Sequence, residues 1–401
     1  YIHVTGTSGK GSVCLMLSAI LKKSGRKVGT ITSPHPSTIT ERWDINGRSV
    51  SQKRFSELVE FIKPKLDDYL RTSPYEIPSF FEIVTAIGLL YFAEEKIDWA
   101  IIEVGLGGRY DSTNVIPNRD ACVITNIGND HQDIIGPTKQ DIAYEKAGII
   151  KRGCQIFTME KNKRMLKIIQ NECTIKKSGE LKIIKYENKK LCIINYGING
   201  TNFKYENKQY SLSAPGEHQI KNAILAIEIA KELKINNKAI LFGLKKVKLP
   251  LRMEVVSKKP LIILDGAHNP DKIKTTVKTI SSILSFPRPE GITLERGNDD
   301  HNLHLIVGFS DDKNWPKMIQ QLAKLQPRTI ACTRFTNNIF RKTANPKYIA
   351  KKFRKLLPKT PITIWLDPRE ALNWSKRQNK TRDIILANGS FFLSGEIKLY
   401  I

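Results

Sequence analysis

The stretch Val4-Thr5-Gly6-Thr7-Ser8-Gly9-Lys10-Gly11-Ser12 decides the fold of this chain. A short apolar run, Tyr1 to Thr5, predicts a strand before the glycines, and apolar residues at helical spacing follow them. Glycines allow backbone N–H groups to turn toward phosphate oxygens, the helix N-terminus adds the positive end of its dipole, and a lysine adds a mobile cation. We therefore predict a phosphate-binding turn made of Gly6, Thr7, Gly9, Lys10, Gly11 and Ser12.

This turn departs from the usual P-loop pattern GxxxxGK[ST] at two positions. Val4 stands where the first glycine is expected, and Gly11 separates Lys10 from Ser12. A chance glycine turn is the alternative interpretation. The strand-turn-helix context disfavours it, because that context is the one that phosphate binding requires.

The first part of the chain alternates apolar runs with amphipathic segments. Gly25 is expected to end the first helix. Strands are predicted at Tyr1 to Thr5, Lys27 to Thr32, Ile97 to Val104 and Ala121 to Ile127, and helical segments near Phe55 to Leu66 and Phe80 to Phe92. Such alternation predicts a mostly parallel sheet covered by helices, as in P-loop NTPases.

Later segments predict a small antiparallel subsheet and a second domain. Short alternating runs between about residues 153 and 213 suggest the subsheet, and a helix is expected from His218 to Leu233. Strands of a smaller Rossmann-like domain are predicted at Met253 to Val256, Leu261 to Leu264, Leu303 to Val307, Thr329 to Cys332, Ile362 to Trp365 and Ile384 to Ala387. Pro287 to Asn302 is expected to be an exposed loop. The class is therefore α/β, with domains at 1–250 and 251–401.

Composition limits the possible partners. The chain has 401 residues, enough for two domains, and 65 Lys and Arg against 39 Asp and Glu, a formal charge of +26. Such a charge suits polyanionic ligands or nucleic acid, but lysines spread over solvated faces are the favoured explanation. No basic helix with interleaved aromatic residues stands out, so no nucleic-acid partner is expected.

Cysteine usage and hydropathy favour a cytoplasmic protein. The six cysteines lie without any CxxC pair, which indicates reduced thiols rather than disulfides or a zinc knuckle. No apolar stretch reaches the roughly 20 residues of a membrane helix, so a soluble chain without a membrane partner is expected. Because the sequence starts at Tyr1 inside a predicted strand, an N-terminal segment is expected to have been lost or removed.

Two polar side chains follow predicted strands. Glu103 ends one buried strand and His131 follows another, and ligands of open α/β sheets gather at the carboxyl ends of strands. Glu103 is therefore a candidate to hold magnesium, and His131 a candidate metal ligand. A surface charge or helix cap is the alternative for Glu103, and an unremarkable loop residue is the alternative for His131.

A set of motifs, spread in order along the whole chain, resembles the folylpolyglutamate and dihydrofolate synthases of the Mur ligase superfamily. The motifs are Gly6 to Ser12, Ser33-Pro34-His35, Glu41-Arg42 with Ile45-Asn46-Gly47, Glu103 to Asn114, Asp130-His131-Gln132, Glu145 to Lys151, His218-Gln219 with Asn222, Asp265-Gly266-Ala267-His268-Asn269-Pro270 and Asn388-Gly389-Ser390. Two positions differ from the family pattern: Pro36 replaces a common Leu, and Pro250-Leu251-Arg252 replaces Pro-Gly-Arg.

The resemblance implies a nucleotide and metal site. Lys10 and the P-loop amides would hold the phosphates of ATP, Asn222 would meet the adenine, and Arg252, Asp265 and His268 would reach the nucleotide from the second domain. Ser33, Glu103 and His131 would ligate magnesium, with two magnesium sites expected. Lys146 occupies the place of a lysine that is often carbamylated in this family, and an unmodified lysine paired with an acid is the alternative.

The resemblance also implies the substrates, which are folate or dihydropteroate and L-glutamate, and a monomeric state. Substrate binding would involve Pro34, His35, Arg42, Ser79, Phe81 and Asp111. From sequence alone, an ordinary core aromatic is the favoured interpretation of Phe81. Lys10, His131, Lys146, Asp111 and His268 are the candidate catalytic residues, with His268 or Asp111 assisting proton removal.

The expected reaction is an ATP-dependent ligation. Transfer of the γ-phosphoryl group would turn the carboxylate into an acyl phosphate, which the amine of glutamate would displace. Another Mur-type amide ligase is the alternative within the superfamily. From another class, the charge allows a nucleic-acid-binding P-loop protein.

Overall fold

The computed structural model describes residues 1–128, 132–186, 191–285, 302–338, 341–380 and 383–401. The chain forms two compact units: unit 1 consists of Tyr1–Cys192, Phe203–Ser211 and Gln219–Val247, and unit 2 consists of Ile193–Asn202, Leu212–His218 and Lys248–Ile401. The expected division into domains at residue 250 stays a prediction. Within the described ranges, no helix is long and apolar enough to cross a membrane.

Unit 1 contains an eight-stranded sheet with the order β4-β3-β2-β5-β1-β6-β7-β8. All neighbouring strands pair in parallel except at the edge made by β3 and β4. The strands are β1 (Ile2–Thr5), β2 (Val28–Ile31), β3 (Trp43–Ile45), β4 (Arg48–Ser49), β5 (Trp99–Glu103), β6 (Ala121–Ile124), β7 (Gln155–Thr158) and β8 (Leu181–Ile183). The mostly parallel sheet expected from the sequence is therefore confirmed.

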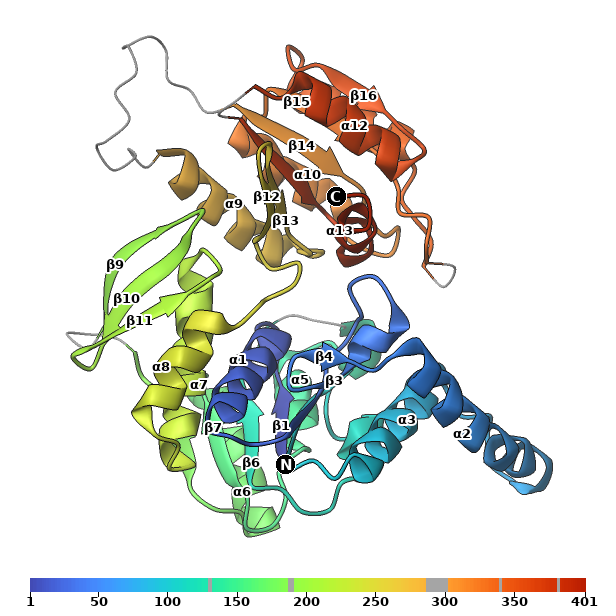
Figure 1. Ribbon diagram of the computed structural model, residues 1–401, viewed down its shortest axis with the longest axis vertical. Helices are drawn as coiled ribbons and strands as arrows, with labels where there is room; N and C mark the ends of the chain where they lie inside the picture. Colours follow the sequence, from blue (N-terminus) through green and yellow to red (C-terminus); the bar gives the residue numbers. More distant parts are fainter. Residues whose placement is uncertain (129–131, 187–190, 286–301, 339–340, 381–382) are drawn as a thin grey trace. The chain divides into compact units, whose positions relative to one another are not determined.

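Helices cover this sheet (Figure 1). The helices of unit 1 are α1 (Lys10–Lys23), α2 (Gln52–Thr72), α3 (Phe80–Glu94), α4 (Gln132–Ile135), α5 (Lys139–Ala147), α6 (Lys163–Lys176), α7 (Glu217–Glu232) and α8 (Asn237–Lys246), with 3-10 turns η1 (Ile39–Arg42) and η2 (Ser112–Val115). β1 and β6 are buried at every position, as strands with both faces covered must be. Apolar residues of α5 and α6 pack with β6 and β7 in one core cluster, and those of α3 pack with β2 and β5 in another.

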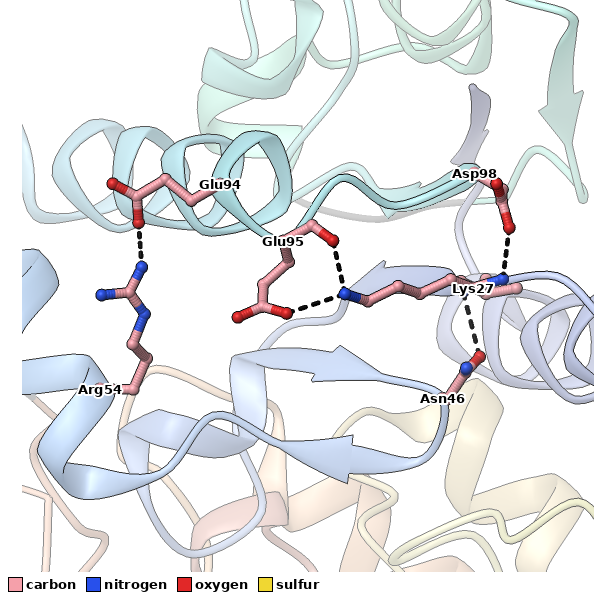
Figure 2. Close-up of polar contacts among 7 residues, drawn as sticks. Lys27, Asn46, Arg54, Glu94, Glu95 and Asp98 are labelled. Carbon is pink, nitrogen blue, oxygen red and sulfur yellow. Dashed lines mark hydrogen bonds and ion pairs between the residues drawn. The ribbon is translucent and has the colours of Figure 1, made fainter.

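Polar contacts anchor the amino end of β2 (Figure 2). The Lys27 ammonium donates to the backbone oxygen of Glu95 at 2.5 Å and to its carboxylate at 2.9 Å, while the Lys27 N–H donates to Asp98 Oδ2 at 2.7 Å. Asn46 and Gly47 both have positive φ, 55° and 79°, as the tight turn between β3 and β4 requires. These contacts fix the amino end of β2, and the carboxyl end of the strand leads to Ser33.

The antiparallel subsheet is smaller than the sequence suggested. Only β9 (Leu191–Gly197), β10 (Gly200–Tyr205) and β11 (Lys208–Leu212) form it, in the order β11-β10-β9. The prediction that the subsheet begins near residue 153 was wrong, because β7 and β8 pair in parallel with the main sheet on either side of helix α6. Short apolar runs do not show from sequence which sheet they join.

Unit 2 contains a six-stranded sheet with the order β12-β13-β17-β14-β15-β16, antiparallel only between β12 and β13. Its strands are β12 (Glu254–Lys258), β13 (Leu261–Leu264), β14 (Leu303–Val307), β15 (Thr329–Cys332), β16 (Ile362–Ile364) and β17 (Ile384–Asn388). Its helices are α9 (Pro270–Ser285), α10 (Trp315–Leu322), α11 (Pro346–Leu356), α12 (Pro368–Gln378) and α13 (Phe391–Lys398), with the 3-10 turn η3 (Ala323–Leu325). Two core clusters cover opposite faces of the sheet, one with α9, α10 and α11 and the other with α12 and α13. The Rossmann-like α/β architecture is as expected, and most of the predicted loop at 287–302 lies outside the described residues.

Candidate active site

The glycine turn connects β1 to α1, as the sequence predicts. Gly6 and Gly9 have φ values of 145° and 83°, which side-chain-bearing residues rarely adopt. Lys10 begins α1, and its Nζ donates to the Gly6 carbonyl oxygen at 2.9 Å. Among the described residues no side chain caps this helix N-terminus, and the first turn of α1 contains no acidic residue. The N–H groups of that turn can therefore be satisfied by an anion such as phosphate.

Residues after β6 brace the turn, which the sequence did not indicate. Thr7 N donates to the Asn126 carbonyl oxygen at 3.0 Å, and Ser8 N donates to Asn126 Oδ1 at 3.0 Å. Thr125 Oγ1 donates to the Ser8 carbonyl oxygen at 2.6 Å. A β-carbon on Gly6 would lie 1.8 Å from Thr125 Oγ1. The two strand ends therefore fit together only when residue 6 is glycine.

Asn222 of α7 lies at the second glycine of the turn. A β-carbon on Gly9 would lie 2.4 Å from Asn222 Oδ1, and Asn222 Nδ2 donates to Gln219 Oε1 at 3.0 Å. Asn222 was predicted from the family motif, and the structure places it beside the phosphate-binding turn. Gln219 orients the Asn222 amide, because the two residues are one turn apart on α7.

Glu103 lies at the carboxyl end of β5, next to the strand that leads into the turn. Val4 of β1 pairs with Glu103 in the sheet, and the Glu103 side chain is only 4% exposed. Its Oε2 accepts a hydrogen bond from the Ser33 N–H at 3.0 Å, so the structure brings together two of the residues predicted to ligate a metal, and that role stays a prediction. A buried carboxylate beside a phosphate-binding turn is suited to a hydrated magnesium ion.

His35 and Arg42 lie close to this carboxylate. Arg42 Nε donates to His35 Nδ1 at 3.1 Å, and burial followed by the charge of Arg42 lowers the pKa of His35 to about 4. The imidazole is therefore neutral near pH 7. Burial also lowers the pKa of Arg42, and the nearby charge of Glu103 opposes that shift. Pro34 follows Ser33 through a cis peptide bond.

The two predicted substrate residues at the start of α3 have different environments. Ser79 caps the helix, because its Oγ accepts from Glu82 N at 3.3 Å while its N–H donates to Glu82 Oε2 at 2.7 Å. Phe81 is partly buried and packs against the loop after β5, where a β-carbon on Gly105 would lie 2.4 Å from its ring. Its ring thus lies beside Asp111, whose Oδ2 would be 3.1 Å from the same β-carbon.

Asp111 organises the loop between β5 and η2. Its Oδ2 accepts from Leu106 N at 2.8 Å, and its Oδ1 accepts from Thr113 N at 3.0 Å and from the Thr113 hydroxyl. The carboxylate therefore fixes the turn that directly follows the Glu103 strand, and both of its oxygens are hydrogen-bonded within the loop.

Lys146 lies in the last turn of α5 and is 2% exposed. The same turn packs against the loop after β5, because Arg109 N donates to the Glu145 carbonyl oxygen at 2.8 Å. Burial raises the pKa of Glu145, whereas the charges of Arg109 and Lys146 lower it. The predicted ligand His131 lies outside the described residues.

Polar residues hold these loops together, among them the buried Arg119, which the sequence did not single out. Arg119 donates through Nη1 to the Ile149 carbonyl oxygen and through Nη2 to Asn114 Oδ1 at 2.9 Å. Asn114 Nδ2 in turn donates to the Gly148 carbonyl oxygen at 3.2 Å. No sequence signal distinguishes Arg119 from a surface arginine, and its 6% exposure became evident only in the fold.

Each of the predicted nucleotide residues of unit 2 has a hydrogen-bond partner within that unit. Asp265 is buried, and its carboxylate accepts from Met253 N at 3.0 Å, Thr276 Oγ1 at 2.7 Å and Asn388 Nδ2 at 3.0 Å. Burial raises the pKa of Asp265, and the hydrogen bonds from Thr276 and Met253 oppose the shift. Arg252 Nη1 donates to the Pro250 carbonyl oxygen at 2.9 Å.

His268 follows Asp265 at the start of α9. Its Nδ1 lies 2.8 Å from the Gly266 carbonyl oxygen, and its Nε2 lies 3.1 Å from Lys272 Nζ. Because a carbonyl oxygen only accepts hydrogen bonds, Nδ1 carries a proton. A lone pair on Nε2 can then accept from the Lys272 ammonium.

Comparison with known proteins gives the same family for both units. Residues 71–230 match the Mur ligase middle domain, and residues 251–391 match the "Mur ligase, glutamate ligase domain". The dihydrofolate synthase/folylpolyglutamate synthase of Bacillus subtilis (strain 168) is 32% identical over 99% of this chain and 89% of its own.

Solved structures that resemble this chain belong to the same family. The folylpolyglutamate synthase from Thermotoga maritima is 30% identical, with a TM-score of 0.82 over 100% of this chain and 88% of its own. The bifunctional folylpolyglutamate synthase/dihydrofolate synthase from Yersinia pestis, complexed with AMPPNP and a Mn ion, is 27% identical, with a TM-score of 0.77 over 99% of this chain and 88% of its own.

Proposed function

The chain belongs to the folylpolyglutamate synthase/dihydrofolate synthase family, whose reaction is the ATP-dependent ligation of glutamate to a folate, and we propose that the residues described above carry out this ligation through an acyl phosphate. The observation that carries the proposal is the uncapped start of α1 behind the turn of Gly6 and Gly9, next to the buried carboxylate of Glu103.

The phosphate-binding turn fits the triphosphate of ATP. Gly6 and Gly9 leave room where a β-carbon would collide, and the first turn of α1 presents N–H groups and itself contains no acidic residue. The Lys10 ammonium can exchange its contact with the Gly6 carbonyl oxygen for a phosphate oxygen. Asn222 beside Gly9 supports a role in nucleotide binding, and Arg252, Asp265 and His268 are proposed to complete that site.

A divalent cation fits the carboxyl ends of the strands. The Glu103 carboxylate accepts from the Ser33 N–H, so we propose that Glu103 and the Ser33 hydroxyl are ligands of one magnesium ion. His131 is proposed as a further ligand, and a second magnesium site is proposed near Lys146. Magnesium neutralises phosphate oxygens during phosphoryl transfer. Glu103 is suited to that ion because it is buried and ends the strand next to β1.

Lys146 is proposed to be carbamylated. Its side chain is buried, and a plain ammonium next to two divalent cations would be repelled. A carbamate gives the side chain a negative charge and two oxygen ligands of the kind that magnesium prefers.

The ligation proceeds by two displacements. The substrate carboxylate attacks the γ-phosphorus, ADP leaves, and the resulting acyl phosphate contains a leaving group that a carboxylate lacks. Lys10 and the P-loop N–H groups stabilise the charge on the transferred phosphoryl oxygens. The glutamate amine then attacks the acyl carbon, phosphate leaves, and His268 or Asp111 accepts the proton that the amine loses.

Folate or dihydropteroate is proposed to bind between the Ser33-Pro34-His35 segment and Phe81, with Arg42, Ser79 and Asp111 nearby. The neutral His35, held by Arg42, supports this position because it can accept or donate without carrying charge. L-glutamate as the amine, a monomeric state and the absence of a nucleic-acid partner are parts of the proposal. The free cysteines support a reducing, cytoplasmic compartment.

Product analysis tests the proposal. The protein is incubated with ATP, magnesium and glutamate, and with either dihydropteroate or tetrahydrofolate. A product one glutamate larger, formed only with ATP, is expected. The variant Lys10→Ala should form none, whereas Lys23→Ala, an exposed lysine at the end of the same helix, should react like the parent. Ligation by Lys10→Ala at the parent rate contradicts the assigned role of the turn.

The alternatives have their own readouts. Product formation with muramyl-peptide precursors but not with folates would identify another Mur-type ligase. A gel shift with nucleic acid that persists at about 200 mM salt would favour a nucleic-acid-binding protein, because attraction by charge alone fades there.

A further inference from the structure

Two buried polar side chains of β1 face the loop that follows β5. His3 and Thr5 lie two residues apart, so they project from the same face of the strand. Thr5 Oγ1 donates to the Gly107 carbonyl oxygen at 2.7 Å, and His3 Nε2 lies 2.8 Å from Thr113 Oγ1. The strand that leads into the phosphate-binding turn is therefore joined at two points to the segment that contains Asp111.

The position of the proton on the His3 ring follows from its partners. The Thr113 hydroxyl has one proton, and it donates this proton to Asp111 Oδ1, because an ionised carboxylate can only accept. The Thr113 oxygen must then be the acceptor toward His3, so His3 Nε2 carries the proton. The direction of donation runs from His3 through Thr113 to Asp111.

The surroundings keep the ring neutral. His3 is 1% exposed, and among the described residues its Nδ1 has no hydrogen-bond partner. A second proton on Nδ1 would be a buried donor without an acceptor, close to the cations Arg119 and Lys151. Burial and these two charges lower the pKa of His3 well below its usual value. The ring is thus a fixed neutral donor.

We propose that His3 is a positioning residue of the ligation, which acts as a neutral Nε2–H donor and, through the Thr113 hydroxyl, holds the Asp111 carboxylate in place. This inference rests on the proposed function, where Asp111 is assigned to the reacting end of the substrate. Asp111 Oδ2 in turn fixes Leu106 N, so the hydrogen-bond chain extends from β1 to the turn directly after Glu103.

The tautomer can be tested without any assay of activity. Nitrogen NMR of the full chain, with the His3 signals assigned by their loss in His3→Gln, should show a neutral ring protonated at Nε2 from pH 6 to pH 8. A ring protonated at Nδ1, or one that titrates within this range, overturns the inference. This result is independent of whether the protein ligates glutamate.

The positioning role is tested by kinetics. His3→Phe keeps a ring but removes the donor, and we expect kcat to fall by roughly 10- to 100-fold with KM for ATP changed by less than about threefold. His3→Gln restores an amide N–H donor and should keep kcat within about threefold of the parent. Thr113→Val should resemble His3→Phe, and Thr113→Ser should resemble the parent.

Thermal unfolding of each variant separates positioning from packing. Equal kcat losses in His3→Phe and His3→Gln, or losses of Tm without a change in kcat, overturn the inference and make His3 a core residue only. If the parent protein itself ligates no glutamate to any folate, the proposed function fails, while the NMR result still decides the state of the ring.

Discussion

Gly9 lies directly against the side-chain amide of Asn222, although 213 positions separate them in the chain. A β-carbon at Gly9 would lie 2.4 Å from Asn222 Oδ1, and the glycine has a φ of +83°. The close approach of α7 to the phosphate-binding turn therefore requires a residue without a side chain.

The first prediction is that Gly9→Ala weakens ATP binding by at least about tenfold, because the new methyl group must displace the Asn222 amide or distort the turn. Gly25→Ala is the matched control: Gly25 has a similar φ of +88°, but nothing lies within 4 Å of a β-carbon there. It should lose about 1 kcal/mol of stability from backbone strain and keep its affinity for ATP. Calorimetric titration measures the affinity of both variants for ATP. If Gly9→Ala and Gly25→Ala lose affinity equally, backbone strain alone is responsible.

The second prediction concerns Glu103, whose Oε2 accepts from the Ser33 N–H at 3.0 Å. Glu103→Gln keeps the shape but removes the charge, so the magnesium concentration for half-maximal activity should rise by roughly 10- to 100-fold. Glu94→Gln, which breaks the surface ion pair with Arg54, should leave the magnesium dependence unchanged. An unaltered magnesium titration of Glu103→Gln would remove this residue from the metal site.

The third prediction concerns the buried Lys146. Intact-protein mass spectrometry under native conditions in bicarbonate buffer should show the addition of one carbon dioxide, which is absent in Lys146→Gln and present in Lys139→Gln, a lysine at the exposed start of the same helix. Activity should fall when carbon dioxide is removed and recover when bicarbonate is returned. A parent protein of unmodified mass with full activity would exclude the carbamate.

The fourth prediction is a pH dependence of stability. The pKa of His3 is lowered well below its usual 6.5 in the folded protein, so the unfolded chain binds a proton there that the folded chain does not. As the pH falls below about 6.5, stability should decrease, by at most about 1.4 kcal/mol per pH unit from this one group. Urea unfolding between pH 5 and pH 7 measures the slope, which should be smaller in His3→Gln. An identical slope in both proteins would assign the effect to other groups.

The fifth prediction concerns Leu251, which replaces the glycine of the family pattern and has a φ of +53°. The side chain is 1% exposed and packs in the core with α12 and α13. Leu251→Gly should lose roughly 1–3 kcal/mol, because lost burial of about 2–5 kcal/mol exceeds relieved strain of about 1–2 kcal/mol. Leu251→Ala keeps the strain and should be about 1 kcal/mol less stable than Leu251→Gly. If alanine is the more stable variant, the strain is negligible.

Local sequence signals predicted much of the fold. The strands Leu261–Leu264, Leu303–Val307 and Thr329–Cys332 have the bounds that their apolar runs indicate. The assignment of residues 153 to 183 to the antiparallel subsheet was wrong, because Gln155–Thr158 and Leu181–Ile183 are too short to show which strands they pair with. The strands with which these two segments pair depend on how the helix between them packs on the sheet. A short window of sequence contains no information about that packing.

The sequence by itself determined the phosphate-binding turn and the family, because both depend on residues that are adjacent in the chain: glycines before Lys10, a carboxylate at the end of an apolar run, and ordered motifs. Only the tertiary structure decided which distant side chains meet there. Asn126 at Ser8 and Thr113 between His3 and Asp111 have distant partners that no local sequence pattern shows. They acquire defined partners because parallel strands bring their carboxyl ends, and the loops that follow them, to one edge of the sheet.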